Sequence, residues 1–227
     1  MIKINDLPRG TVERIVSDIV LETLRGKELD DRWFRIQYFE QGIGLAPFDI
    51  AIARLLAEHY PLVPLVEVGA GMGQLSALVA VNGHPSWAIE RDSVRLDMAH
   101  AVRAAIVRRF PQVQGHYSVV GDSFPNRTGY LVKNAVVCSS FIPYAIPDEQ
   151  FDAILDALAP ARGLIVAVRS FLVPERLSSL KNSWDYEPVL MDMLRTRGWG
   201  EPETVYEWRH PEYRFQPDKI VWLRRSQ

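Results

Sequence analysis

The residues best suited to binding chemistry form a glycine-rich stretch that starts with an acid, EVGAGMG at positions 67–73. Three glycines at alternate positions let the backbone turn sharply and approach a ligand with no Cβ atom in the way. The carboxylate of Glu67, two places before the first glycine, would repel a pyrophosphate and attract an ammonium group. The stretch therefore predicts a loop that binds a ligand carrying positive charge.

The spacing of the glycines separates this loop from a dinucleotide-binding loop. The dinucleotide pattern is G-x-G-x-x-G, and Gln74 occupies the position that this pattern reserves for its last glycine. The sequence also contains no Tyr-x-x-x-Lys pair, since Tyr130 and Lys133 are only three positions apart. An NAD-dependent oxidoreductase is therefore disfavoured, although it stays an alternative.

The elements that must position this loop are a strand before it and a helix after it. Residues 65–68 are largely apolar, as expected of a short central strand in a parallel sheet, where both faces are covered. Leu75, Leu78 and Val79 have helical spacing, which predicts a helix whose first N–H groups point at the ligand. The stretch is therefore interpreted as a strand–turn–helix unit.

Strands and helices alternate along the rest of the chain. Apolar patterns predict strands at 87–90, 117–120, 135–138, 164–168, 204–208 and 219–223, and helices at 92–110, 148–158 and 187–197. Ligands of such sheets bind beyond the carboxyl ends of the parallel strands. Glu90, Asp122 and the loop from Ser139 follow the second, third and fourth predicted strands, so they are expected to border the ligand.

These features resemble motif I, and the acidic positions after it, of the class I (Rossmann-like) S-adenosylmethionine-dependent methyltransferases. The cofactor of that family has an α-amino group and no phosphate. The resemblance covers about residues 62–226 in the order of elements. It implies an α/β fold with a doubly wound, mostly parallel seven-stranded sheet and a C-terminal antiparallel hairpin. Together with the helical pattern of the residues ahead of it, this divides the chain into an N-terminal helical cap, 1–60, and a methyltransferase core, 61–227.

The same resemblance assigns roles to individual residues. Glu90 would accept hydrogen bonds from the ribose hydroxyls of S-adenosylmethionine, and Asp122 would accept one from its adenine amino group. Both acids are expected to face a cleft outside the core, so replacing them should change the stability of the fold little. The implied cofactor-binding positions are Glu67, Gly69, Ala70, Gly71, Gly73, Glu90, Arg91, Asp122, Ser123 and Ser139.

The segment ahead of the sheet is predicted to be helical. An apolar stripe predicts a helix over 11–25 with Thr11 as its N-cap, and a second helix is expected over 47–60. An aromatic-rich piece at 30–40 is also expected to be helical. This layer is interpreted either as a packing cap or as a lid that closes over cofactor and substrate.

Composition narrows the class of protein. The 227 residues carry a net charge of −2, which disfavours a broad phosphate-binding surface and hence nucleic acid as a partner. The single cysteine, Cys138, excludes an internal disulfide and agrees with a cytoplasmic location. No apolar run approaches the ~18 residues that span a bilayer, so no membrane partner is expected. Four arginines of the predicted helix 92–110 are interpreted as a solvated face: Arg95, Arg103, Arg108 and Arg109.

The predicted activity is methyl transfer from S-adenosylmethionine to an oxygen or nitrogen of a small molecule. Such an in-line displacement depends mainly on positioning, so no metal is expected and no residue is assigned a catalytic role. The loop at 140–144, SFIPY, lacks the N/D-P-P-Y/F signature used on exocyclic amines of bases and on glutamine side chains. Two further alternatives stay open, a protein methyltransferase of the lysine type and a non-catalytic partner subunit that binds the cofactor.

Overall fold

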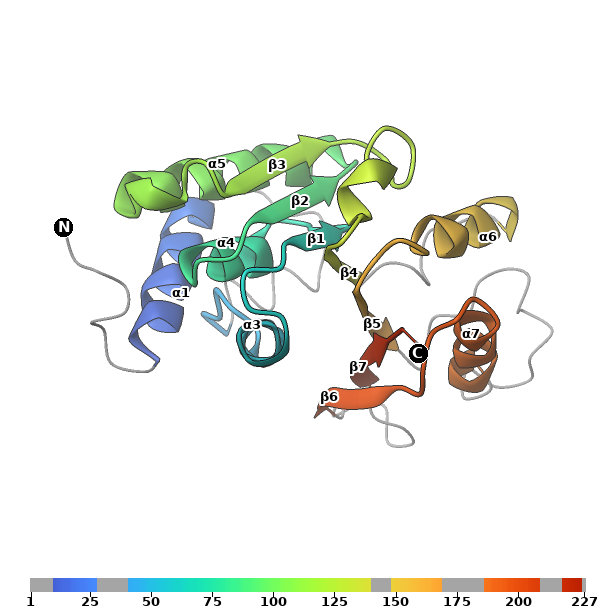
Figure 1. Cartoon of the computed structure of the whole chain (residues 1–227). Coiled ribbons are helices and arrows are strands. Elements are labelled where there is room, and N and C mark those ends of the chain that lie inside the picture. Colours follow the sequence, from blue (N-terminus) through green and yellow to red (C-terminus); the bar gives the residue numbers. More distant parts are fainter. Residues whose placement is uncertain (1–9, 28–40, 140–147, 169–185, 209–217, 226–227) are drawn as a thin grey trace. The chain divides into compact units, whose positions relative to one another are not determined.

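A computed structural model describes residues 10–27, 41–139, 148–168, 186–208 and 218–225 (Figure 1). Two predictions lie outside the described residues. They are the helix over 30–40 and the placement of the loop at 140–144 beside the ligand.

The strands form one seven-stranded sheet in the order β3-β2-β1-β4-β5-β7-β6. Their bounds are β1 Leu65–Val68, β2 Ser86–Glu90, β3 Tyr117–Gly121, β4 Val136–Ser139, β5 Gly163–Val168, β6 Glu203–Trp208 and β7 Asp218–Arg224. β2 pairs in parallel with β1 and β3, and β4 pairs in parallel with β5. β7 is antiparallel to both β5 and β6. The predicted mostly parallel sheet with an antiparallel C-terminal pair is therefore confirmed.

The chain forms two compact units, Met1–Gly121 and Asp122–Gln227. The division into a helical cap, 1–60, and a core, 61–227, stays a prediction.

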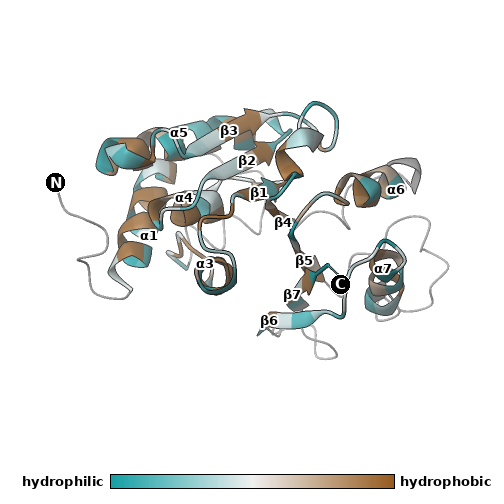
Figure 2. Ribbon diagram, viewed as in Figure 1, coloured by the Kyte–Doolittle hydropathy of each residue, from teal (hydrophilic) through white to brown (hydrophobic). Residues whose placement is uncertain are grey.

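In the first unit, α4 (Gln74–Val81) and α5 (Ser93–Arg109) pack against the strands β1 to β3 (Figure 1). Two outer helices cover them, since α1 (Thr11–Leu24) packs on α4 and α5, and α3 (Pro47–His59) packs on α4. Every residue of α4 is buried between the sheet and these outer helices. For this reason α4 is largely apolar and lacks the polar face of a surface helix (Figure 2).

The outer helices are joined by specific contacts. Gly44, ahead of α3, lies so close to α1 that a Cβ atom there would collide with the Ser17 carbonyl. The Gly44 N–H also donates to Ser17 Oγ at 3.2 Å. Glu13 of α1 and Arg54 of α3 form an ion pair at 3.5 Å. These contacts agree with a packing role for α1 and α3, while the lid stays an untested alternative.

Two details of the first unit differ from the sequence interpretation. The N-cap of α1 is Gly10, in the left-handed conformation at φ 85°, and Thr11 is the first helical residue. Arg103 is not simply solvated, because its guanidinium donates to the carbonyls of Tyr117 at 2.7 Å and Gln114 at 3.3 Å. Arg103 therefore fastens α5 to the start of β3.

The second unit contains β4 to β7 together with α6 (Asp148–Ala157) and α7 (Tyr186–Arg195). All six residues of β5 are buried, as expected of a strand covered on both faces. Two tryptophans contribute large side chains to this core, Trp199 with no exposed surface and Trp222 with 2% exposed.

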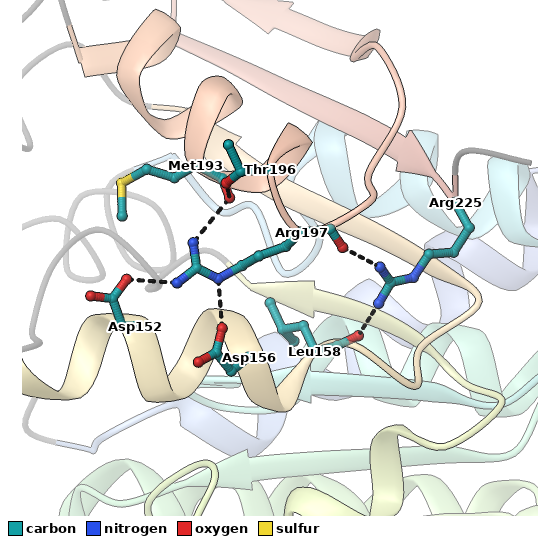
Figure 3. Close-up of polar contacts among 7 residues, drawn as sticks. All are labelled: Asp152, Asp156, Leu158, Met193, Thr196, Arg197 and Arg225. Carbon is teal, nitrogen blue, oxygen red and sulfur yellow. Dashed lines mark hydrogen bonds and ion pairs between the residues drawn. The ribbon is translucent and has the colours of Figure 1, made fainter.

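Two arginines connect the helices of the second unit to its last strand (Figure 3). The guanidinium of Arg197, just after α7, donates to Asp152 and Asp156 of α6, both at 2.7 Å. It also donates to the Met193 carbonyl at 3.1 Å. Arg197 thereby holds the end of α7 against the side of α6.

Arg225, at the end of β7, completes this connection (Figure 3). Its guanidinium donates to the Arg197 carbonyl at 2.6 Å and to the carbonyls of Leu158 and Ala159, which follow α6. It also lies over the Trp199 ring, 4.1 Å from the ring centroid. One side chain therefore satisfies three carbonyls and covers the buried indole.

Replacing this guanidinium should destabilise the second unit. Arg225→Met keeps the length of the side chain but leaves the three carbonyls without their donor, so we expect a loss of about 1–2 kcal/mol in unfolding free energy. Urea unfolding followed by tryptophan fluorescence measures it. Arg162→Met is the matched control, because the Arg162 side chain is exposed. Equal midpoints for the two variants would contradict the assigned role.

Candidate functional site

The glycines of the turn between β1 and α4 are required by its backbone conformation. Gly69, Gly71 and Gly73 have φ values of 70°, 57° and 70°. Residues with a Cβ atom rarely adopt this left-handed region. Alternation of left-handed and ordinary residues therefore accounts for the G-x-G-x-G spacing.

The N–H groups of this turn have acceptors within the protein. Gly69 and Ala70 both donate to the Ile89 carbonyl of β2, at 2.9 and 3.0 Å, and Gly73 donates to the Ala70 carbonyl at 2.9 Å. Gly71 donates to Glu90 Oε2 at 2.8 Å. These N–H groups therefore stabilise the turn internally. Among the first N–H groups of α4, that of Ser76 donates to Glu67 Oε2 at 3.1 Å, and the prediction that this end of the helix points at a ligand stays a prediction.

Glu90 is the main acceptor for this part of the structure. Besides the Gly71 N–H, its Oε1 atom accepts from the backbone N–H groups of Arg91 at 2.8 Å and Asp92 at 2.9 Å. A carboxylate has about four acceptor positions, so roughly one is left for a ligand. Glu90 is only 4% exposed. The expectation that Glu90 lies outside the core is therefore wrong, and its three hydrogen bonds predict a role in stability that the sequence interpretation did not foresee.

Glu67 lies beneath the turn and contacts α4. It is 7% exposed, and its Oε2 atom accepts from Ser76 Oγ at 2.6 Å and from Ser76 N at 3.1 Å. Its Oε1 atom makes no hydrogen bond with any residue that the structure describes. Burial is the main cause that raises the pKa of Glu67 to about 8, and the nearby Asp49 and Glu90 carboxylates add to it.

Asp49, in the first turn of α3, is a third buried acid that the sequence interpretation missed. It is 2% exposed, and its Oδ2 atom accepts from the Ala46 N–H at 2.8 Å. Burial raises the pKa of Asp49 to about 7. Asp49 follows Pro47 by two places, which is a helix-start signal, but that signal predicts a solvated cap rather than a buried acid.

Glu67 and Glu90 thus contact the turn and the first turn of α4, and Asp49 lies close enough to Glu67 to raise its pKa. Among the described residues, no lysine or arginine forms an ion pair with any of Asp49, Glu67 and Glu90. Burying acids without a cation is unfavourable unless they take up protons or a cation binds. The electrostatics of this region suit a cationic ligand and oppose a pyrophosphate.

The remaining predicted site residues show the following environments. Asp122 accepts from the Ser123 N–H at 2.8 Å and lies 3.6 Å from Arg127 Nε, so it already has local partners. Ser139, the last residue of β4, is fully buried. Arg91 has an exposed side chain. The structure brings Glu90 and Gly71 together, and the ligand contacts of the other positions stay predictions.

Comparison with known proteins identifies the fold. No protein family model matches the chain, and no curated protein matches it. A magnesium protoporphyrin IX methyltransferase from Synechocystis with bound SAH aligns at 17% identity and a TM-score of 0.61, over 92% of this chain and 94% of that one. The CcbJ methyltransferase from Streptomyces caelestis aligns at 15% identity and a TM-score of 0.58, over 80% of this chain and 91% of that one. A putative RNA methyltransferase from Pyrococcus horikoshii aligns at 12% identity and a TM-score of 0.56, over 95% of this chain and 97% of that one.

The chain therefore has the class I (Rossmann-like) fold of the S-adenosylmethionine-dependent methyltransferases, as the sequence predicted. Within the described residues, no helix is long and apolar enough to cross a membrane. No group of three described His, Cys, Asp or Glu side chains could hold a metal ion.

The buried acids should make stability depend on pH. The pKa values of Asp49 and Glu67 rise to about 7 and about 8 in the folded protein, from 3.8 and 4.5. The folded state then binds more protons than the unfolded state, so stability should fall as the pH rises from about 5 to about 8. Urea midpoints measured across this range test the prediction.

Two variants isolate the contribution of Glu67 to this dependence. Glu67→Gln removes the titrating group and should flatten the curve, most clearly between about pH 7 and 8. Glu58→Gln removes an acid whose side chain is 75% exposed and should leave the curve unchanged. A wild-type midpoint that rises over this range would contradict the assignment.

Proposed function

We propose that this protein is an S-adenosylmethionine-dependent methyltransferase that methylates an oxygen or nitrogen of a small molecule. The single observation that carries the proposal is the set of buried acids around a left-handed glycine turn, in a fold that neighbours with bound SAH share. The fold alone does not assign an activity, so the chemistry of this region is the second support.

The residues around the turn fit the charge of this cofactor. S-adenosylmethionine carries a sulfonium and an ammonium group and no phosphate. Asp49, Glu67 and Glu90 are buried acids with no described cationic side chain paired to them, and a bound cation would favour their ionised forms. Glu67 has one carboxylate oxygen without a described hydrogen bond, and Glu90 has about one acceptor position left. These are acceptors for an ammonium group and for a hydroxyl.

The residues that would hold the cofactor are those of the turn and the strand ends. Glu67 and the glycine turn would hold its amino-acid end, and Glu90 its ribose. Arg91, Asp122, Ser123 and Ser139 complete the set that the resemblance implies. When bound, S-adenosylmethionine supplies an electrophilic methyl group.

The chain's own contribution is to bind and to orient. A methyl displacement requires the acceptor atom in line with the bond that breaks, so positioning supplies most of the rate acceleration. The rigid, internally hydrogen-bonded turn suits that task, because a turn that is already ordered loses little entropy on binding. No residue of the chain is assigned as a general base.

A small-molecule acceptor is preferred to a polynucleotide on electrostatic grounds. The net charge of −2 provides no general attraction for a phosphate backbone. An RNA or protein acceptor, or a non-catalytic cofactor-binding role, would appear as an outcome of acceptor screening with the purified protein.

Ligand binding tests the proposal directly. The purified protein should bind S-adenosylmethionine and S-adenosylhomocysteine in calorimetric titrations and should not bind NADH, because the buried acids oppose its pyrophosphate. Mass spectrometry of ligands that co-purify with the protein provides an independent check. Tight binding of NADH without binding of either adenosyl ligand would overturn the proposal.

Glu90 should affect both affinity and stability. Glu90→Gln replaces an accepting oxygen by an amide NH2, so at least one backbone N–H of the turn region loses its acceptor. We expect S-adenosylhomocysteine affinity to fall on the order of ten- to a hundredfold, at ~1.4 kcal/mol per decade. The unfolding free energy should fall by about 1–3 kcal/mol.

Asp97→Asn is the matched control for Glu90→Gln, since Asp97 is an exposed acid on α5. Titration and urea unfolding of both variants separate the two effects. Unchanged affinity in Glu90→Gln, under conditions in which that variant is folded, would remove Glu90 from the site.

A further inference from the structure

Tyr117 lies beneath the glycine turn and belongs to none of the predicted site positions. It is the first residue of β3, has no exposed surface, and its hydroxyl donates to the Gly73 carbonyl at 2.9 Å. Since a carbonyl carries no hydrogen, the phenol must be the donor in this bond. Burial raises the pKa of Tyr117, which keeps the hydroxyl protonated.

The contact occupies the junction between the turn and α4. The Gly73 carbonyl also accepts from Ala77 N at 2.9 Å, so Tyr117 supplies the second donor to the oxygen that begins the helix. A Cβ atom on Gly73 would lie 2.6 Å from the Tyr117 hydroxyl oxygen. Glycine is therefore required at this position by two independent constraints, its left-handed φ of 70° and the tyrosine hydroxyl.

Tyr117 is itself held in place by its neighbours. Its carbonyl accepts from Arg103 Nε of α5 at 2.7 Å. Its backbone pairs with Ser86 of β2, and Ser86 Oγ donates to the Ser76 carbonyl of α4 at 2.8 Å. The first turn of α4 is thus fixed from both β2 and β3.

We propose that Tyr117 is a positioning residue for the ligand-binding turn, acting through the Gly73 carbonyl. Gly73 N donates to Ala70 O, and Gly71 N donates to Glu90, so a shift of Gly73 passes to the turn and to the acid at the end of β2. The expected effect on cofactor affinity rests on the proposed function, whereas the ordering of the turn by Tyr117 is independent of it.

Hydrogen exchange in the free protein tests the local effect. Tyr117→Phe removes only the hydroxyl. We expect the Ala77 amide to exchange about five- to tenfold faster, beyond any change at the Ile106 amide in buried α5. A merely structural role would change both amides by the same factor. Tyr130→Phe is the control, because Tyr130 is 76% exposed and should change neither amide.

A double-mutant cycle with Gly73→Ala tests the contact itself. The added Cβ collides with the hydroxyl in the wild type, whereas the strain of the left-handed backbone is present in both backgrounds and cancels. Gly73→Ala should lower the folding equilibrium constant in both backgrounds. We expect the factor of this loss to be about fivefold or more smaller in Tyr117→Phe than in the wild type. If Gly73→Ala does not fold but the double variant does, that result would also support the contact. Additive effects, together with equal exchange at both amides, would overturn the proposal.

Titration with S-adenosylhomocysteine connects the contact to function. Tyr117→Phe should bind it roughly three- to tenfold more weakly, and Tyr130→Phe should bind it like the wild type. Wild-type affinity in Tyr117→Phe would overturn the effect on binding. If the wild type does not bind this ligand, the proposed function fails, while the exchange rates and the cycle still decide whether Tyr117 orders the turn.

Discussion

The turn from β1 into α4 depends on the carboxylate of Glu90. Three left-handed glycines within five residues make a backbone that has little conformational preference of its own. Glu90 accepts from Gly71 within the turn and from Arg91 and Asp92 at the start of the next crossover. One side chain therefore ties the carboxyl ends of two parallel strands together. A shorter acid at this position would not reach all three donors from the same strand register.

The same region is electrostatically unbalanced, which is uncommon in a structural core. Asp49, Glu67 and Glu90 are all buried, and the described residues provide hydrogen bonds but no ion pair for them. Such an arrangement lowers the stability of the free protein and increases the gain when a cation binds. Asp49 and Glu67 both have raised pKa values, and shifted groups gathered in one place are typical of functional sites, where local stability is sacrificed for ligand recognition.

The sequence predicted most of this architecture because each signal was local. Apolar runs and helical spacing located the elements of the sheet, and the glycine spacing located the turn. What it missed depends on three-dimensional neighbours. The burial of Asp49 follows from α3 packing on α4. Glu90 accepts from the Gly71 N–H, and Arg103 donates to carbonyls before and within β3. Both contacts join elements that are distant in sequence, so local sequence patterns do not reveal them. Thr11 was misassigned because Gly10 takes the cap by its backbone conformation rather than through a side-chain oxygen.

Proton uptake by the buried acids also changes the colloidal behaviour of the folded chain. The net charge of −2 and the isoelectric point of about 6.2 follow from composition, with every carboxyl group given the pKa it has in an unfolded peptide. Because burial raises the pKa values of Asp49 and Glu67, the folded molecule retains protons that the unfolded chain loses, and its net charge near neutral pH is closer to zero. Its isoelectric point therefore lies above the sequence value and nearer to neutral pH. Since molecules with little net charge associate readily, concentrated solutions of the free protein should remain clear more easily above neutral pH than at it.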